Sequence, residues 1–217
     1  LVYPFVKYDL VQIEYKNQHV SGCASEDFLK KNEILIPVEK LYRQYTGESL
    51  AVKLTEFDEI TGKIQYLVEQ VENITHIEGL GKYITAMLEI DAIFFNEDRH
   101  TNNIAVIYNE KTQRYSLSPL FDQGLCIFAD TSVDYPLELS YEACLEKIES
   151  KPFSMDFDIQ LEAAEELYGT QIDFNFNIED VNAILDSVAR IYSEEICNRI
   201  RELLRYQIRK YSYLIKK

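Results

Sequence analysis

The sequence contains little glycine and proline, no tryptophan and few basic residues. Its 217 residues include 7 Gly, 5 Pro and no Trp, and 22 Lys and Arg stand against 37 Asp and Glu, for a formal net charge of −15. This acidic excess repels phosphate backbones and anionic lipid, which excludes a general nucleic-acid coat or a polybasic membrane anchor as the main role. Hydrophobic residues make up 47% of the chain, which excludes a disordered protein. The length suits one large domain or two small lobes.

Cysteine and long apolar runs are also scarce. The four cysteines lie far apart and form no C-x-x-C pair, which argues against a zinc ribbon or a dithiol redox centre, so we expect reduced and mostly buried thiols. No stretch approaches the roughly 18 apolar residues of a membrane span, and the first residues do not resemble a signal peptide. We therefore expect a cytoplasmic protein without a membrane or nucleic-acid partner. Because the chain starts at Leu1 and enters a strand-like pattern almost at once, we also expect that an upstream segment has been removed.

Hydrophobic periodicity predicts an α+β fold that is mostly helical and carries two small β-hairpins. Alternating residues at 8–15, a turn at 16–18 and an apolar run at 20–24 predict the first hairpin. Two further short apolar runs separated by a polar turn predict the second. Residues at helical spacing predict helices in several segments, and no Gly or Pro interrupts the last of them. The second hairpin is predicted at 104–108 and 115–121, and the helices at 37–45, 58–71, 82–95, 156–168 and from 177 onward, the last with Asn177 as its N-cap and Asp180 three residues later.

The most specific motif is Asn96-Glu97-Asp98-Arg99-His100-Thr101-Asn102-Asn103, located where a predicted helix ends and a strand begins. Asp98 and Asn103 have the D-x-x-x-x-N spacing of kinase catalytic loops, in which the carboxylate accepts the proton of the acceptor hydroxyl and the amide oxygen holds magnesium. Antiparallel pairing returns the chain to this loop at Asp122. We therefore expect three oxygen-bearing side chains to meet around a hard cation such as Mg²⁺.

The same residues also have a purely structural interpretation. Asp98 could cap a turn, Asn103 could occupy a left-handed position and Asp122 could simply start a loop, as acidic and amide residues often do. The neighbouring Asp91 is open to two interpretations as well. It lies on the apolar side of its helix, where it either accepts hydrogen bonds from Arg99 or His100 or faces solvent.

The run Asn96-Glu97-Asp98-Arg99-His100-x-x-Asn103-Ile104, followed by Phe121-Asp122-x-Gly124, resembles the C-terminal domain of HipA-like serine/threonine kinases, including the CtkA-type relatives. Its D-R-H-x-x-N-I core also resembles the catalytic loop of phosphatidylinositol kinases. The resemblance implies a protein-kinase-like fold, with residues 1–29 as a hairpin and hinge remaining from a small N-terminal lobe and residues 30–217 as the helical C-terminal lobe. It further implies that Asp98 is the catalytic base, that His100 supports it, and that Asn103 and Asp122 bind Mg²⁺ and, through it, ATP.

The sequence departs from the kinase pattern in its first third. A complete kinase needs a glycine-rich loop and a lysine on the phosphates, and no G-x-G-x-x-G is present. The segment Leu50-Ala51-Val52-Lys53 imitates the lysine-bearing strand, but a solvated lysine in a loop between helices is the favoured interpretation. The resemblance therefore places the missing parts on an N-terminal lobe, which either precedes this chain or belongs to a separate polypeptide.

The predicted function is transfer of the ATP γ-phosphate to a serine or threonine hydroxyl of a protein. HipA-like relatives act as toxins on aminoacyl-tRNA synthetases, so the resemblance implies a substrate such as a translation factor and an antitoxin as a partner. Three alternatives stay open: a non-catalytic kinase-like binding module, a phosphoinositide-type kinase, and a metal-dependent phosphohydrolase that uses Asp98 and His100, which the presence of only three histidines disfavours. Lys151 either presents a cation to a substrate phosphate or, as favoured here, lies in a solvated loop.

Overall fold

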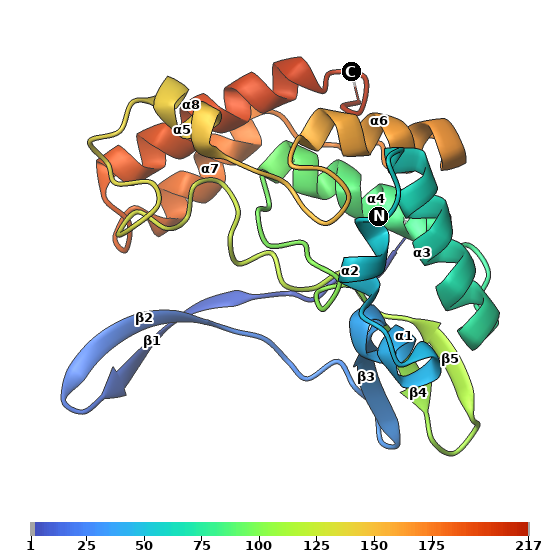
Figure 1. The fold of residues 1–217 in the computed structure, drawn as a ribbon. Helices are drawn as coiled ribbons and strands as arrows, with labels where there is room; N and C mark the ends of the chain where they lie inside the picture. Colours follow the sequence, from blue (N-terminus) through green and yellow to red (C-terminus); the bar gives the residue numbers. More distant parts are fainter. Residues whose placement is uncertain (1–2, 217) are drawn as a thin grey trace.

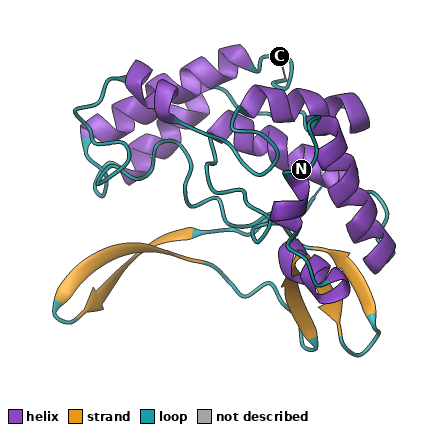
Figure 2. Ribbon diagram, viewed as in Figure 1, coloured by secondary structure: helices purple, strands orange, loops and turns teal. Residues whose placement is uncertain are grey.

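The computed structural model describes residues 3–216, so the start of the chain at Leu1 lies outside the described residues. A helical body carries two small antiparallel sheets, which confirms the predicted α+β, mostly helical fold (Figures 1 and 2). Within the described residues, no helix is both long and apolar enough to cross a membrane. The strands are β1 (Asp9–Tyr15), β2 (Gln18–Ala24), β3 (Glu33–Pro37), β4 (Ala105–Asn109) and β5 (Arg114–Leu117), and the helices are α1 (Val38–Thr46), α2 (Leu50–Leu54), α3 (Ile60–Thr75), α4 (Leu80–Phe94), α5 (Tyr141–Lys147), α6 (Phe157–Tyr168), α7 (Ile178–Val188) and α8 (Glu194–Lys210).

The predicted first hairpin is present as β1 and β2, which extend from the body as an arm (Figure 1). Its turn residues Lys16 and Asn17 both have positive φ, as a two-residue turn between twisted strands requires. Ile13 pairs with Val20 on the apolar face of the arm, and side chains there are largely exposed, with Tyr15 at 59%. An isolated two-stranded hairpin is only marginally stable in water. The uncovered apolar face therefore lacks the packing that such a hairpin normally needs.

The second predicted hairpin is part of a three-stranded sheet in the order β3-β4-β5. The sequence analysis did not predict β3, whose short apolar run lies immediately before Pro37 and is too brief to show a period. The prediction that a helix begins at Pro37 was wrong by one residue, because Pro37 ends β3 and occupies the N-cap position of α1. The last strand is also shorter than predicted, since β5 ends at Leu117 and the chain continues to Phe121 as a loop.

Helix α4 forms the centre of the core and ends at the motif. It is buried along almost its whole length, including the ionisable residues Glu89 and Asp91, and it packs against α3, α6 and α8 (Figure 1). Gly81 allows a close approach to α6, because a Cβ atom at this position would lie only 2.3 Å from Cε1 of Tyr168. As predicted, most of the cysteines are buried: Cys126, Cys144 and Cys197 are, whereas Cys23 is exposed, and all four are free thiols.

Glu89 is an ionisable group in the middle of α4 with no exposed surface. Its carboxyl group accepts the backbone N–H groups of Gln171 and Ile172 at 2.7 and 2.8 Å, which attaches the segment after α6 to α4. Burial raises the pKa of Glu89 to about 7, although the two N–H donors act in the opposite direction. The carboxyl group of Glu89 therefore stays protonated in the folded protein at pH values where it is ionised in the unfolded chain.

The stability that Glu89 contributes should decrease as the pH rises. A carboxyl group whose pKa is raised by folding contributes its full stabilisation below its unfolded pKa, and this contribution is lost as the pH rises through the folded value of about 7. We expect the difference in unfolding free energy between the native protein and a Glu89→Gln variant to fall by about 3 kcal/mol from roughly pH 4 to 8. Urea denaturation across this pH range measures both unfolding free energies. If the two free energies changed with pH in parallel, the raised pKa of Glu89 would be contradicted.

The predicted C-terminal helical run consists of two helices. Asn177 caps α7 in a reciprocal capping box with Asp180, as its position in the sequence indicated, but a break follows α7 and Ser193 caps α8. Arg201 on α8 donates to Asn182 and Asp186 of α7, and this holds the two helices antiparallel. A mainly aliphatic cavity of about 620 Å³ lies between these helices and the segment 127–131, and it offers few polar groups for phosphate chemistry.

Candidate active site

A buried ion pair anchors the loop formed by the motif residues 96–103, called the motif loop below. Arg99 and Asp91 are 1% and 0% exposed, and the guanidinium donates to both carboxylate oxygens, from Nε at 2.7 Å and from Nη2 at 3.0 Å. The side chain of Asn96 donates to the same carboxylate at 2.8 Å. Of the two interpretations of Asp91, the structure therefore supports the role of accepting hydrogen bonds from Arg99.

The remaining nitrogen of Arg99 joins two segments that are distant in sequence. Its Nη1 donates to the backbone carbonyl oxygen of Asn103 at 2.9 Å and to that of Phe121 at 3.1 Å. One guanidinium therefore holds the end of the motif loop beside the residue that precedes Asp122. The two segments meet as predicted, but strand pairing is not what joins them. The β4–β5 pairing ends at Leu117, and the hydrogen bonds of Arg99 hold the two segments together beyond that point.

Asp98 presents a partly exposed carboxylate at the edge of this loop. Its side chain is 35% exposed, and the side-chain nitrogen of Asn103 donates to its backbone carbonyl at 2.9 Å and reaches its Oδ2 at 3.4 Å. The Nε2 atom of His100 lies 3.7 Å from Oδ1. The carboxylate is therefore accessible to a hydroxyl group from outside while its orientation is restrained by the loop.

His100 is better placed to shape the loop than to transfer protons. Its Nδ1 accepts the backbone N–H of Asn102 at 3.2 Å, and its backbone N–H and C=O bond to Asp98 and Asn103 at 2.9 and 2.8 Å. These bonds close a tight turn between the two residues that the motif places at D-x-x-x-x-N spacing. His100 thus braces the turn with both its ring and its backbone.

Two side chains, Asn103 in the motif loop and Asp122 in the segment after Phe121, carry the type of oxygen that a hard cation binds. The side-chain nitrogen of Asn103 donates to Asp98, and among residues 3–216 no group donates a hydrogen bond to Oδ1 of Asn103. The exposed carboxylate of Asp122 also forms no hydrogen bond or ion pair with these residues. No group of three or more His, Cys, Asp or Glu side chains in this part of the chain could hold a metal alone. The residues therefore fit a Mg²⁺ ion that takes its other ligands from phosphates and water, as Mg²⁺ commonly does.

Glu39 is a supporting residue that the sequence analysis missed. It lies on α1, is 7% exposed, and accepts a hydrogen bond from the Thr101 hydroxyl of the motif loop at 3.1 Å. It also accepts from Ser49 and from the backbone of Ala51, so it links the loop to the start of α2. Burial alone would raise the pKa of Glu39, but these hydrogen bonds, with that of Arg43, outweigh it and lower the pKa. No local pattern marks this role, because the partner residues are 62 positions apart.

Lys53 does not lie on a strand. It belongs to the short helix α2, where its ammonium group pairs with Glu56 three residues later. The expectation of a loop at this position was therefore wrong, because residues 50–54 form a helix, and the ammonium group of Lys53 is engaged by Glu56.

The fold is similar to that of a kinase of known structure. No protein-family model and no curated protein matches the chain. Among solved structures, the chain is similar to the crystal structure of the proinflammatory kinase CtkA from Helicobacter pylori, with 16% sequence identity and a TM-score of 0.59, over 95% of this chain and 78% of CtkA. The predicted kinase-like architecture of the CtkA type is thereby confirmed at the level of the fold.

Proposed function

We propose that this chain is the catalytic lobe of an ATP-dependent protein kinase that phosphorylates serine or threonine hydroxyls. The observation that carries the proposal is the convergence on Arg99 of two segments, one bearing Asp98 and Asn103 and the other bearing Asp122. The similarity of the fold to a solved kinase supports the broader class. A protein substrate such as a translation factor is part of the same proposal.

In this mechanism the side chains of the two segments divide metal binding, proton transfer and positioning among them. Asn103 Oδ1 and the Asp122 carboxylate would hold Mg²⁺, which when bound to ATP neutralises charge on the phosphates. Asp98 accepts the proton of the acceptor hydroxyl as its oxygen attacks the γ-phosphorus in line. His100 and Asn103 keep that carboxylate in its orientation. Positioning and electrostatic stabilisation thus supply most of the rate acceleration.

The phosphate-binding elements are proposed to lie on a small lobe that packs against the β1–β2 arm. The uncovered apolar face of the arm supports this arrangement, since a two-stranded hairpin gains stability from an added strand or layer. The small lobe is part of the same polypeptide or of a separate one, and an antitoxin is a further proposed partner. The β1–β2 arm and the segment up to residue 29 would then be the hairpin and hinge of that small lobe.

A non-catalytic kinase-like binding module is the second candidate function. It is favoured by one specific observation, the lack of a glycine-rich loop in a sequence with only 7 glycines. Such a module would bind nucleotide or a partner without phosphoryl transfer. Binding and transfer must therefore be measured separately.

Nucleotide binding should require Mg²⁺ and depend on Asp122. Calorimetric titration of Mg·ATP and Mg·ADP into the natural gene product that contains this chain is expected to give heat that disappears with EDTA. An Asp122→Asn variant should bind at least about tenfold more weakly, since it loses a charged ligand. Glu110→Gln, which removes another exposed carboxylate from the β4–β5 turn, should bind normally. Absence of binding would overturn the proposal, and binding without transfer would favour the second candidate.

A further inference from the structure

We propose that Lys151 contacts the γ-phosphoryl group during transfer, an inference that rests on the proposed kinase function. Its Nζ lies 4.0 Å from Oδ1 of Asp98, the proposed base, although the two residues are distant in sequence and belong to different segments. The lysine thus stands beside the point at which the acceptor oxygen and the γ-phosphorus would meet. The sequence pattern alone favours a solvated loop at this position.

Other basic side chains around the loop already have partners. Arg99 is occupied by Asp91 and two backbone carbonyls, and Lys147 pairs with Asp134. Lys63 donates to the backbone carbonyl of Phe153 at 3.2 Å. None of these cations could meet a phosphate without giving up its own interactions. The side chain of Lys151 is 51% exposed, and among residues 3–216 it forms no hydrogen bond and no ion pair other than the loose one with Asp98.

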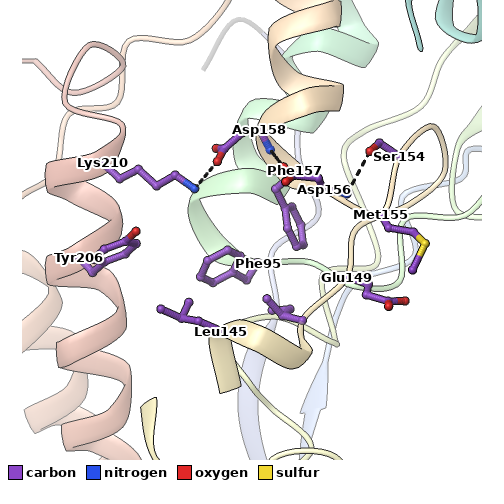
Figure 3. A pocket seen from close by; sticks show the side chains of 11 residues that line it. Phe95, Leu145, Glu149, Ser154, Met155, Asp156, Phe157, Asp158, Tyr206 and Lys210 are labelled. Atoms are coloured by element: carbon purple, nitrogen blue, oxygen red, sulfur yellow. Dashed lines mark hydrogen bonds and ion pairs between the residues drawn. The ribbon is translucent and has the colours of Figure 1, made fainter. Parts of the chain in front are cut away.

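The loop that carries Lys151 is anchored on both sides of it. Ser150 is 2% exposed, and it bonds through its backbone N–H to Met155 at 2.9 Å and through its hydroxyl to Ser154 at 2.7 Å. Phe153 is 1% exposed, and its backbone N–H donates to the Gln160 side chain at 3.4 Å. Figure 3 shows the end of this loop, where the Asp156 backbone N–H donates to the Ser154 hydroxyl just before α6 begins. The backbone at Lys151 is therefore held in place beside the motif.

The contact with Asp98 is suited to exchange for a phosphate. An ion pair at 4.0 Å between two partly exposed groups contributes little to stability, so little is lost when the ammonium turns to a new anion. The acidic groups Glu97 and Asp98, which both interact with Lys151, would repel the γ-phosphate, and a lysine here offsets part of that repulsion. A cation aimed at the charge on the transferring group stabilises the transition state.

The chemical step leaves Lys151 unchanged. The acceptor oxygen forms a bond to the γ-phosphorus, and the bond from this phosphorus to the bridging oxygen breaks, with its electron pair leaving on ADP. Asp98 takes the hydroxyl proton. Lys151 keeps all its protons and donates hydrogen bonds to equatorial oxygens of the phosphoryl group, a role that depends on charge and position only.

The test compares Lys151→Met, which removes the charge, with Lys151→Arg, which keeps it. We expect Lys151→Met to lower kcat by about 100-fold and to reduce the affinity for Mg·ATP while that for Mg·ADP is unchanged, because ADP lacks the γ-phosphate. Lys151→Arg should recover part of both losses. A matched control, Lys147→Met, removes a neighbouring cation that pairs with Asp134 and should behave as the unaltered protein.

The outcomes separate this inference from the function on which it rests. Unchanged kcat and an unchanged ratio of ATP to ADP affinity in Lys151→Met would overturn the role of Lys151 alone. Equal losses for ATP and ADP would also overturn it, since they would indicate a general structural effect. If the unaltered protein transfers no phosphate to any protein hydroxyl, the proposed function fails and the role of Lys151 fails with it.

Discussion

Replacing Asp98 with asparagine is expected to abolish phosphoryl transfer while the protein still folds and binds Mg·ATP. The variant keeps the size of the side chain and can still accept from the Asn103 amide, but it cannot take a proton from the acceptor hydroxyl. General-base catalysis by a placed side chain contributes about 100-fold to 10,000-fold in rate. Transfer of labelled γ-phosphate by the natural gene product measures the loss, and thermal unfolding reports whether the fold is intact.

A matched control for Asp98 is Asp134→Asn. Asp134 is also a partly exposed aspartate paired with a lysine, but it lies outside the motif loop. We expect its replacement to leave transfer unchanged. Full transfer by Asp98→Asn would show that this carboxylate is not the base, whereas loss of Mg·ATP binding together with transfer would assign it to the nucleotide site.

The largest effect on stability is expected at Asp91. An Asp91→Ala variant leaves the Arg99 guanidinium buried without its carboxylate, and breaking a buried ion pair in this way costs about 3–5 kcal/mol. Burial by itself would lower the pKa of Arg99, but the neighbouring Asp91 carboxylate outweighs it and raises the pKa, so the arginine stays charged. Urea denaturation should therefore show a clear fall in the unfolding free energy.

A double variant separates stability from function at this pair. Asp91→Leu with Arg99→Met replaces the buried charges by apolar side chains of similar volume, and such exchanges are often neutral or stabilising. Stability should recover relative to Asp91→Ala. Phosphoryl transfer should not recover, because the hydrogen bonds from Arg99 to the carbonyls of Asn103 and Phe121 are lost. Recovery of both properties would show that the guanidinium does not position the site.

Local sequence patterns predicted what depends on neighbouring residues. The turn at Lys16 and Asn17, the capping box at Asn177 and the helical period of α4 each arise from interactions within a few positions, so they are visible in the sequence. The motif from Asn96 to Asn103 belongs to the same class, because its spacing and its tight turn are local. Errors occurred where the local signal was short, as in the strand before Pro37 and the break before Ser193.

The sequence alone therefore determined the class of fold, most helices and the identity of the loop that carries Asp98 and Asn103. Tertiary structure alone decided what surrounds that loop: the buried Arg99 between two backbones, Glu39 on α1, and Lys151. These contacts join residues 22 to 62 positions apart or come from a separately anchored loop. Their partners are selected by burial, which makes a charged group require a counter-charge or hydrogen bonds, and burial is a property of the packed chain.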